Sequence, residues 1–376
     1  MATALRSIRT ARGWSQDRLI YEMERYAQQR LTNVASTASL KTYVSEWENG
    51  KRAISERYAS ILRPLLGVTD AELRGAAEQL IPQQADGYDD LLSRIDSARS
   101  IGESMVQTFL DQTELLRTMD RQMGAAGLVD QMAGHLASME DALTFAVLPG
   151  TRRPIATALA GAATLAAWQA LDAGAVERAW RQYELAKRAA QDADAPLYLA
   201  HAMGEQAYVL RDAGRPEMAV ELIRDALRTH AERQSPRLKA WLSAAEAELC
   251  AAAGMGDDAR RALERAAAHL PEGDEARDAD MASIFLNNGH LARWRGNVLA
   301  MLGDGAAMEE LYAALRSADG SFVRARSGLH SDLAQAHLSR GELDDARTHI
   351  QQARLLANRT GSVRYRRRVE MLTGRL

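Results

Sequence analysis

Five glycines recur at nearly regular intervals in the C-terminal part of the chain, and no other feature restricts its fold as strongly. Gly174, Gly214 and Gly254 are 40 residues apart, and Gly303 and Gly341 follow after 49 and 38 residues. The positions around these glycines repeat the same residue types. A small residue stands seven positions earlier: Ala167, Ala207, Ala247, Gly296 and Ala334. A large apolar residue stands nine positions later: Tyr183, Ile223, Leu263, Tyr312 and Ile350.

This repeat predicts a stack of helical hairpins. Glycine ends a helix readily because it adopts the left-handed conformation that a C-terminal cap requires. The positions five and twelve residues after the glycine hold alanine in four segments, and Met308 and Leu315 in the remaining one. Together with the large residue between them, they form one apolar helix face. A single hairpin cannot bury that face alone, so neighbouring hairpins must stack.

The composition agrees with an all-α fold class. Hydrophobic residues make up 47% of the chain, while aromatic residues make up only 5%. Alanine is abundant, and it is the best helix former although it fills little space in a core. Sustained alternation of apolar and polar residues, the pattern of a half-buried strand, does not occur in the sequence. We therefore predict many closely packed helices and neither a sandwich nor a barrel.

The repeat resembles the tetratricopeptide repeat over residues 156–360. Its spacing exceeds the usual ~34 residues, which implies longer helices or loops. Such an α-solenoid has a concave surface lined by the first helix of each pair. The positions expected to face inward carry aromatic, guanidinium and amide groups, which suit binding of a peptide or small-molecule effector. Taken singly, each of these residues more often has a structural role than a ligand-binding one. The inward positions are Trp168, His201, Tyr208, Arg211, Trp241, Arg293, Asn297 and Gln335.

The N-terminal segment predicts four short helices. Gly13 ends the first helix, and Ser15 is a favourable N-cap for the second, which runs to about Gln29. A third helix buries Leu40 and Trp47, and the Asn-Gly pair that follows ends it. A fourth helix extends over residues 55–67. The outward face of the third helix is polar and consists of Lys41, Thr42, Ser45 and Glu46.

Charge is unevenly distributed between this segment and the rest of the chain. Residues 1–63 contain 11 Lys and Arg against 6 Asp and Glu, a net charge of +5. The whole chain carries −3, so the remaining residues sum to −8. A basic N-terminal segment on an acidic body is typical of a nucleic-acid-binding protein.

Two motifs in the N-terminal segment match a known DNA-binding class. One is the Arg-x-x-x-Gly-Trp-Ser-Gln sequence from Arg9 to Gln16, and the other is Val-Ser-Glu-Trp-Glu-Asn-Gly-Lys-Arg from Val44 to Arg52. The segment resembles the helix-turn-helix of the lambda-repressor-like (XRE) class. With a tetratricopeptide body, the chain also resembles regulators abundant in actinobacteria and, more distantly, peptide-sensing regulators of Gram-positive bacteria.

This resemblance implies that the third helix enters the major groove of double-stranded DNA. Lys41, Thr42 and Ser45 would then contact base edges, and Glu46 would either accept from cytosine or pair within the fold. The residues expected at phosphates are Arg9, Gln16, Lys51 and Arg52. The connection before the third helix departs from the class, because a turn of three or four residues is usual there. Here residues 21–38 must hold an extended second helix and a loop over residues 32–37.

Pro- and Gly-containing stretches at residues 81–87 and 148–154 suggest three regions. They are a helix-turn-helix domain (1–80), a helical linker (88–148) and a tetratricopeptide-like repeat domain (155–376). Within the linker, apolar residues recur at spacings of four and three from Leu91 to Met123. This stripe indicates either a dimerisation helix or a face buried within the chain.

Several other classes of function find no support in the sequence. The single cysteine, Cys250, excludes an internal disulfide, and the eight histidines are scattered without metal-ligand spacing. Residues 155–171 are apolar but shorter than the roughly 20 residues of a membrane span, so we expect a buried helix. The basic run at residues 364–368 is expected to be a solvated last turn.

We therefore expect a cytoplasmic protein that is not an enzyme and uses no cofactor, metal or membrane. The predicted function is a sequence-specific DNA-binding transcriptional regulator, expected to be a homodimer, whose repeat domain dimerises, senses a peptide or small-molecule effector, or does both. The alternative is a repeat-based protein-interaction scaffold with a vestigial or auxiliary helix-turn-helix.

Overall fold

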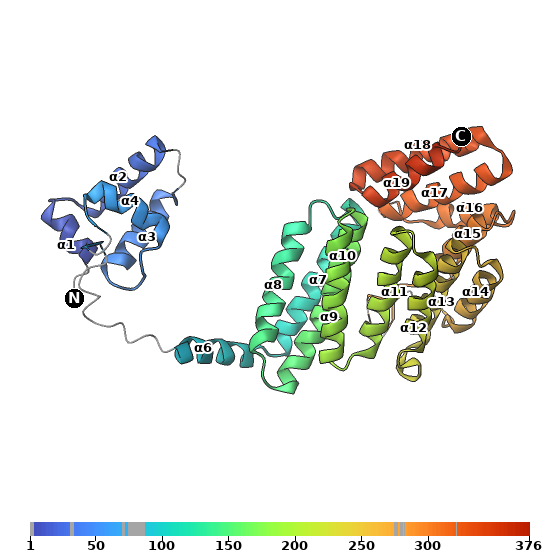
Figure 1. The fold of residues 1–376 in the computed structure, drawn as a ribbon, viewed down its shortest axis with the longest axis horizontal. Helices are drawn as coiled ribbons and strands as arrows, with labels where there is room; N and C mark the ends of the chain where they lie inside the picture. Colours follow the sequence, from blue (N-terminus) through green and yellow to red (C-terminus); the bar gives the residue numbers. More distant parts are fainter. Residues whose placement is uncertain are drawn as a thin grey trace. The chain divides into compact units, whose positions relative to one another are not determined.

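The computed structural model describes residues 4–30, 34–69, 72–73, 87–273, 277–278, 281, 283–320 and 322–376. Within these ranges the only β-type pairing is one isolated bridge between Arg277 and Phe285, so the predicted all-α class is confirmed for them. The chain divides into two compact units, Met1–Ser93 and Arg94–Leu376. Figure 1 shows both units, and each is described separately below.

The first unit contains four helices around one core: α1 (Ala4–Ala11), α2 (Gln16–Gln29), α3 (Thr37–Glu48) and α4 (Glu56–Leu66). The side chains of Ser15 and Ser36 accept hydrogen bonds from backbone amides at the starts of α2 and α3. Ser36 therefore caps α3. Leu40 and Trp47 are buried as predicted. Residues 31–33, part of the predicted loop, lie outside the described residues.

The second unit is built from helices, most of which are joined in sequence by short turns. A helix α6 (Gly87–Arg99) leads into it. Its further helices are α7 (Glu103–Met123), α8 (Val129–Phe145), α9 (Pro149–Asp172), α10 (Val176–Asp192), α11 (Pro196–Asp212), α12 (Pro216–Arg228), the 3-10 turn η2 (Ala231–Arg233), α13 (Pro236–Ala252), α14 (Gly256–His269), α15 (Asn288–Met301), α16 (Ala307–Ser317), α17 (Val323–Arg340), α18 (Leu343–Thr360) and α19 (Val363–Thr373).

The repeated glycines end the first helix of each hairpin, as the sequence predicts. Their φ angles are 78°, 74°, 74°, 70° and 76° in chain order, all in the left-handed region. The residue after each glycine donates its backbone N–H to a carbonyl five residues earlier, as Ala175 does to Ala170 at 2.8 Å. This bond satisfies a carbonyl that the helix end leaves free. The five turns therefore share one geometry at the glycine.

The repeated apolar columns are buried in four of the five hairpins. In α16 the register differs by one position: Ala307, Leu311 and Ala314 are buried, whereas the expected Met308, Tyr312 and Leu315 are only half-buried. The prediction for this helix was therefore wrong. The turn after Gly303 is longer than in the other hairpins, because α16 begins four residues after the glycine rather than two. This longer turn rotates the helix about its axis.

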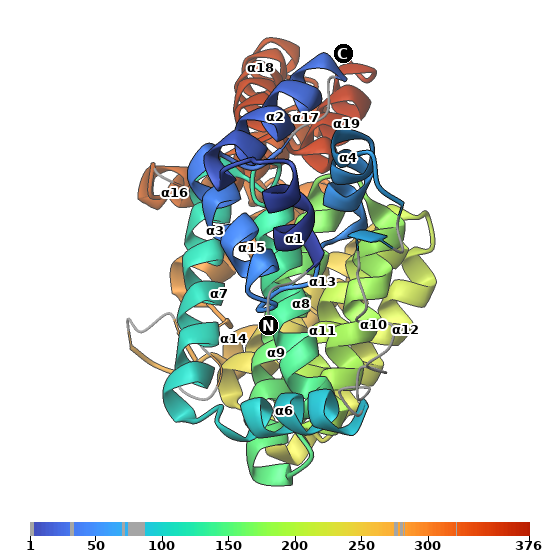
Figure 2. The ribbon, with the colours of Figure 1, turned by 90° about the vertical axis from the view of Figure 1, so that its left-hand side faces the viewer.

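Residues 88–148, predicted to be a helical linker, form separate helices, and α7 and α8 among them pack into the second unit. Their apolar stripe is interrupted at Gly102, which is the N-cap of α7, so α6 and α7 are separate helices. Phe109, Leu116 and Met119 of α7 pack in one apolar cluster with Leu159 of α9. Figures 1 and 2 show α7, α8, α9 and α10 running side by side. This part of the stripe is therefore an internal face. The Pro- and Gly-containing stretch at residues 81–87, which predicts a boundary between regions, lies outside the described residues except for Gly87.

α9 is a long, apolar helix of the second unit. In length and hydropathy it could cross a membrane, but 78% of its most apolar window is buried by the helices around it. Cys250 on α13 is also fully buried, and burial raises the pKa of its thiol to about 11. The burial of α9 agrees with the core helix that the sequence predicts.

The C-terminal helices of the second unit return to its first helices. α17 and α18 contact α7, and α19 contacts α9. The two contact points include glycines: a Cβ on Gly124 would lie 2.1 Å from the carbonyl oxygen of Thr360, and one on Gly174 would lie 2.8 Å from Val363. The hairpins thus follow a closed path, which places their first helices around a common interior.

Candidate functional site

The interior of the second unit contains a cavity of about 760 Å³. Its lining comes mainly from α7 and from the first helix of each hairpin, with α19 closing the ring. All eight residues predicted to face inward line this one cavity: Trp168, His201, Tyr208, Arg211, Trp241, Arg293, Asn297 and Gln335. Their role in binding an effector stays a prediction.

Aromatic side chains form one continuous wall of the cavity. His201 and Trp241 meet edge to face with ring centroids 5.0 Å apart, and Trp241 meets Trp294 in the same way at 5.7 Å. Trp168 and Tyr208 form a second such pair at 5.9 Å. Edge-to-face packing fixes these rings and leaves apolar surface facing the interior.

Glu248 is the centre of a hydrogen-bond network on the same wall. It accepts from the Arg211 guanidinium at 2.7 Å, from the Tyr208 hydroxyl at 2.9 Å and from the Trp294 indole N–H at 2.9 Å. Burial alone would raise the pKa of Glu248, but Arg211, the nearby Arg364 and these hydrogen bonds hold it below its ordinary value. The carboxylate is therefore charged, and the wall around it is rigid.

Ion pairs between helices far apart in the sequence close the ring. Arg324 of α17 binds Asp120 of α7 through two contacts of 2.9 and 2.5 Å, and its guanidinium lies 3.7 Å from Asp172 of α9. The Ser362 hydroxyl donates to the same Asp172 at 2.6 Å. Asp120 and Asp172 are buried, so these pairs lie out of solvent.

Two arginines of the basic run at residues 364–368 point into the cavity wall, which corrects the interpretation of the whole run as a solvated turn; Arg366 and Arg367 are exposed. Arg364 binds Asp212 at 2.7 Å and lies over the ring of Trp168, 5.0 Å from its centroid. Arg368 pairs with the buried Asp332 at 2.6 Å. These two arginines are four positions apart and share one face of α19. That spacing is the signal that the sequence reading overlooked.

In the first unit, the polar face of α3 is accessible. Lys41 and Thr42 are exposed, and Ser45 and Glu46 are half-buried. Lys41 contacts Asp17 of α2 at 2.9 Å, an exposed pair that costs little to open. Glu46 pairs with Arg52 at 3.4 Å, and Arg52 also lies 4.2 Å from the centroid of the Tyr43 ring. Lys51 is exposed. Glu46 therefore has a partner within the fold, the second of the two roles considered for it.

Arg9, predicted at a phosphate, is instead buried. Its guanidinium forms two contacts with Glu48, one of them 2.9 Å long, and also binds the Trp14 carbonyl. The exposed Gln16 donates to the same Glu48 at 2.8 Å. Burial opposes ionisation of Glu48, but hydrogen bonds from Arg9 and Gln16 lower its pKa below the ordinary value. The prediction for Arg9 was wrong, because this pair joins α1 to the end of α3.

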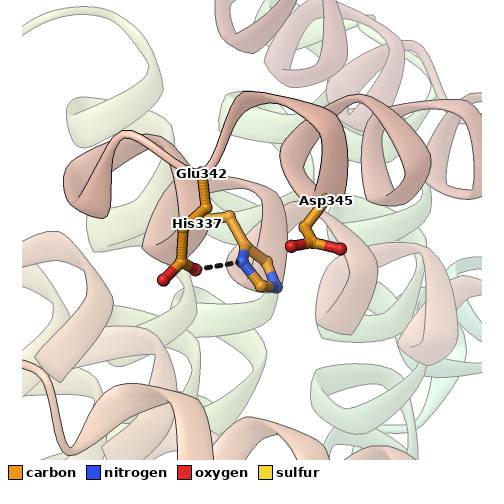
Figure 3. A group of neighbouring side chains, drawn as sticks. All are labelled: His337, Glu342 and Asp345. Atoms are coloured by element: carbon orange, nitrogen blue, oxygen red, sulfur yellow. Dashed lines mark hydrogen bonds and ion pairs between the residues drawn. The ribbon is translucent and has the colours of Figure 1, made fainter.

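Three histidines that are scattered in the sequence meet between α17 and α18. His330 and His349 approach with their Nδ1 atoms 2.9 Å apart, and His337 stacks on His349. Figure 3 shows His337, Glu342 and Asp345, whose ligand atoms lie within 4.8 Å of one another. Glu342 already binds His337 at 2.7 Å and Arg340 at 2.8 Å. We therefore assign this group to the joining of the two helices.

The chain matches no family model, and no curated protein sequence is significantly similar to it.

Proposed function

We propose that the chain is a sequence-specific, DNA-binding transcriptional regulator of the lambda-repressor-like class. In this proposal α3 reads the major groove, and the second unit, a tetratricopeptide-like solenoid, binds an effector in its cavity. The observation that carries the proposal is the accessible polar face of α3 within residues 1–63, the segment of net charge +5. This proposal places the protein in the cytoplasm, where its DNA would be.

The side chains on α3 support this reading through their chemistry. Lysine can donate to the O6 and N7 atoms of guanine, and hydroxyl groups can bond to several base edges. Lys41 and Thr42 are exposed, while the opposite face of α3 is anchored by Leu40, Val44 and Trp47 in the core. A helix anchored in this way presents its polar groups at fixed positions, as direct readout of bases requires. In this proposal Lys51 and Arg52, just beyond the helix, would hold phosphates.

The second unit supports an effector role through the size and lining of its cavity. Ligand pockets of roughly 300–1,000 Å³ enclose molecules of drug size. The cavity falls in this range at about 760 Å³ and combines aromatic walls with polar side chains. We propose that the protein acts as a homodimer on half-sites about 34 Å apart, and that the effector shifts the population of dimers that fit this spacing.

Mobility-shift titrations of the full-length protein test the DNA-binding proposal. The DNA is the region upstream of its own gene, with a shuffled duplex of equal length as the matched control. We expect preferential binding to the upstream region, with an affinity that falls steeply as salt rises, because phosphate contacts release counterions. Equal affinity for both duplexes, or no binding at low salt, would contradict the proposal and favour the interaction scaffold.

A further inference from the structure

The charges on the cavity wall do not balance. Eight arginines line it against five carboxylates, a difference of three positive charges. Five of the arginines have carboxylate partners among the described residues: Arg117, Arg211, Arg324, Arg364 and Arg368. Of the other three, Arg367 is exposed, whereas Arg121 and Arg293 are half-buried and form no ion pair in the part of the chain that the structure describes. Cations removed from solvent without a counter-charge are costly unless a ligand completes the site.

Arg121 and Arg293 belong to one corner of the cavity. Arg121 of α7 lies over the Phe285 ring, 5.3 Å from its centroid, and that ring meets His290 edge to face at 4.6 Å. Arg293 follows His290 by one turn on α15. Burial, followed by the charges of Arg293 and Arg121, lowers the pKa of His290 to about 4. Both guanidiniums are therefore close enough to act on the same imidazole, which stays neutral near pH 7.

Further polar groups at this cavity lack partners. The Ser283 hydroxyl and the amide oxygen of Asn297 are buried without a hydrogen bond among the described residues. Asn297 is 7% exposed, and both residues contribute to the cavity wall. Unsatisfied polar groups are uncommon in folded proteins and are expected where a ligand supplies the missing bond. The Ser283 hydroxyl and the Asn297 amide oxygen are therefore available to hydrogen-bond a ligand in the cavity.

Part of the cavity wall suits an apolar group. Trp241 and Trp294 pack against each other there, and Leu165 and Leu171 also reach the wall. Because α19 closes the ring of helices, the interior is shorter than an open solenoid groove. The space is thus suited to a compact molecule with one charged end and one apolar end.

We propose that the cavity binds a small organic anion, with its acidic group between Arg121 and Arg293 and its apolar body against Trp241 and Trp294. This proposal specifies the chemical class of the effector proposed above. Only the claim that binding of the anion regulates the protein rests on the proposed function. Guanidinium groups bind carboxylate, phosphate and sulfonate oxygens in two-point contacts, so the shared chemistry is an oxyanion on an apolar body.

A pair of fluorescent probes that differ in one charged group tests this inference. 8-Anilinonaphthalene-1-sulfonate carries an anionic sulfonate, and N-phenyl-1-naphthylamine has the same rings without it. Both are titrated into the full-length protein near pH 7 in the absence of DNA, and one saturable site is expected for the sulfonate. Because the neutral probe lacks the charged group that accepts hydrogen bonds from the guanidiniums, we expect it to bind at least about tenfold more weakly.

Variants locate the site of binding. Arg293→Gln and Arg121→Gln should each weaken the sulfonate at least about tenfold while leaving the neutral probe unaffected. Arg178→Gln is the matched control, because Arg178 is exposed and absent from the cavity wall. Arg293→Lys, which keeps the charge, should retain most of the preference for the anion even if Arg293→Gln folds poorly.

Two results would overturn the inference: equal affinity of the native protein for both probes, or a preference for the anion that survives in both glutamine variants. Because no DNA is present, the result is independent of the DNA-binding test. If the protein binds its upstream DNA but does not discriminate between the probes, only the anion site is rejected. If it discriminates between the probes but does not bind the DNA preferentially, only the role as a DNA-binding regulator is rejected.

Discussion

The two units of this chain differ in the charged residues that they enclose. In the first unit most charged side chains are on the outside, and one buried pair among the described residues, Arg9 and Glu48, joins α1 to α3. In the second unit a group of charged residues also lines the inner wall, where Arg324, Arg364 and Arg368 pair with carboxylates from other helices. A unit with an outward polar face suits contact with a large partner. A unit with inward charges suits a ligand that it encloses.

Breaking the buried ion pair of Arg9 and Glu48 in the first unit should lower the free energy of unfolding more than the other substitutions below. In Glu48→Ala the Arg9 guanidinium, only 8% exposed, loses its carboxylate partner. Removing one partner of a buried ion pair costs about 3–5 kcal/mol. Hydrogen exchange followed by mass spectrometry should show faster exchange across α1–α4 and unchanged exchange in α9–α18. Equal acceleration in both units would contradict the separation of the two.

Breaking an ion pair that closes the ring of the second unit should lower the free energy of unfolding by somewhat less. In Asp120→Ala, Arg324 loses two contacts to α7 but keeps Asp172 at 3.7 Å, so we expect a loss of about 2–3 kcal/mol, below the full penalty of an unpaired buried charge. Faster exchange should be confined to α7 and α17–α19. The control Asp141→Ala removes an exposed contact with Arg94 at 3.7 Å and should cost less than about 1 kcal/mol. A loss in Asp120→Ala no larger than in the control would show that the closure contributes little.

The histidine in the cavity predicts a pH dependence of the second unit. The ordinary pKa of histidine is about 6.5, and burial together with Arg293 and Arg121 lowers that of His290 to about 4 in the folded state. Between these values the unfolded chain binds more protons, so stability falls as pH drops from 6.5 towards 4. Asn287 and Phe285 are the other groups that contact the ring.

His290→Gln should remove this contribution. The shift corresponds to up to roughly 3 kcal/mol at the acidic end of the range. Urea unfolding at pH 7 and pH 4.5 measures the difference, and the variant should lose less stability on acidification than the native protein. An unchanged pH dependence would show that His290 is not held neutral.

Local features of the fold were predictable from the sequence, whereas contacts across it were not. The glycine turns and the four regular apolar columns depend on neighbouring residues, so a repeat in the sequence reveals them. The altered register of α16 follows from a longer turn, whose geometry the spacing alone does not fix. The pair of Arg324 and Asp120 joins positions 204 residues apart, which no local pattern connects.

The candidate sites show the same division. The inward positions of the repeats follow from the hairpin pattern, and all eight line the cavity. Arg9 was misassigned because its motif does not reveal that Glu48 lies beside it. Arg121 was missed because the helices before the repeats were not expected to join the ring.

The most direct test of the account is the affinity for the upstream DNA of a full-length protein with two substitutions on α3 of the first unit, measured by fluorescence anisotropy. Lys41→Ala combined with Ser45→Ala removes two polar groups from α3, and Arg25→Ala removes one equal charge from the exposed side of α2. Because each base contact contributes roughly 1–3 kcal/mol, we expect the double variant to bind at least about tenfold more weakly, with its circular dichroism unchanged. Arg25→Ala should bind almost as the native protein does. Equal affinities for the double variant and the native protein would contradict the assignment of α3 to the major groove.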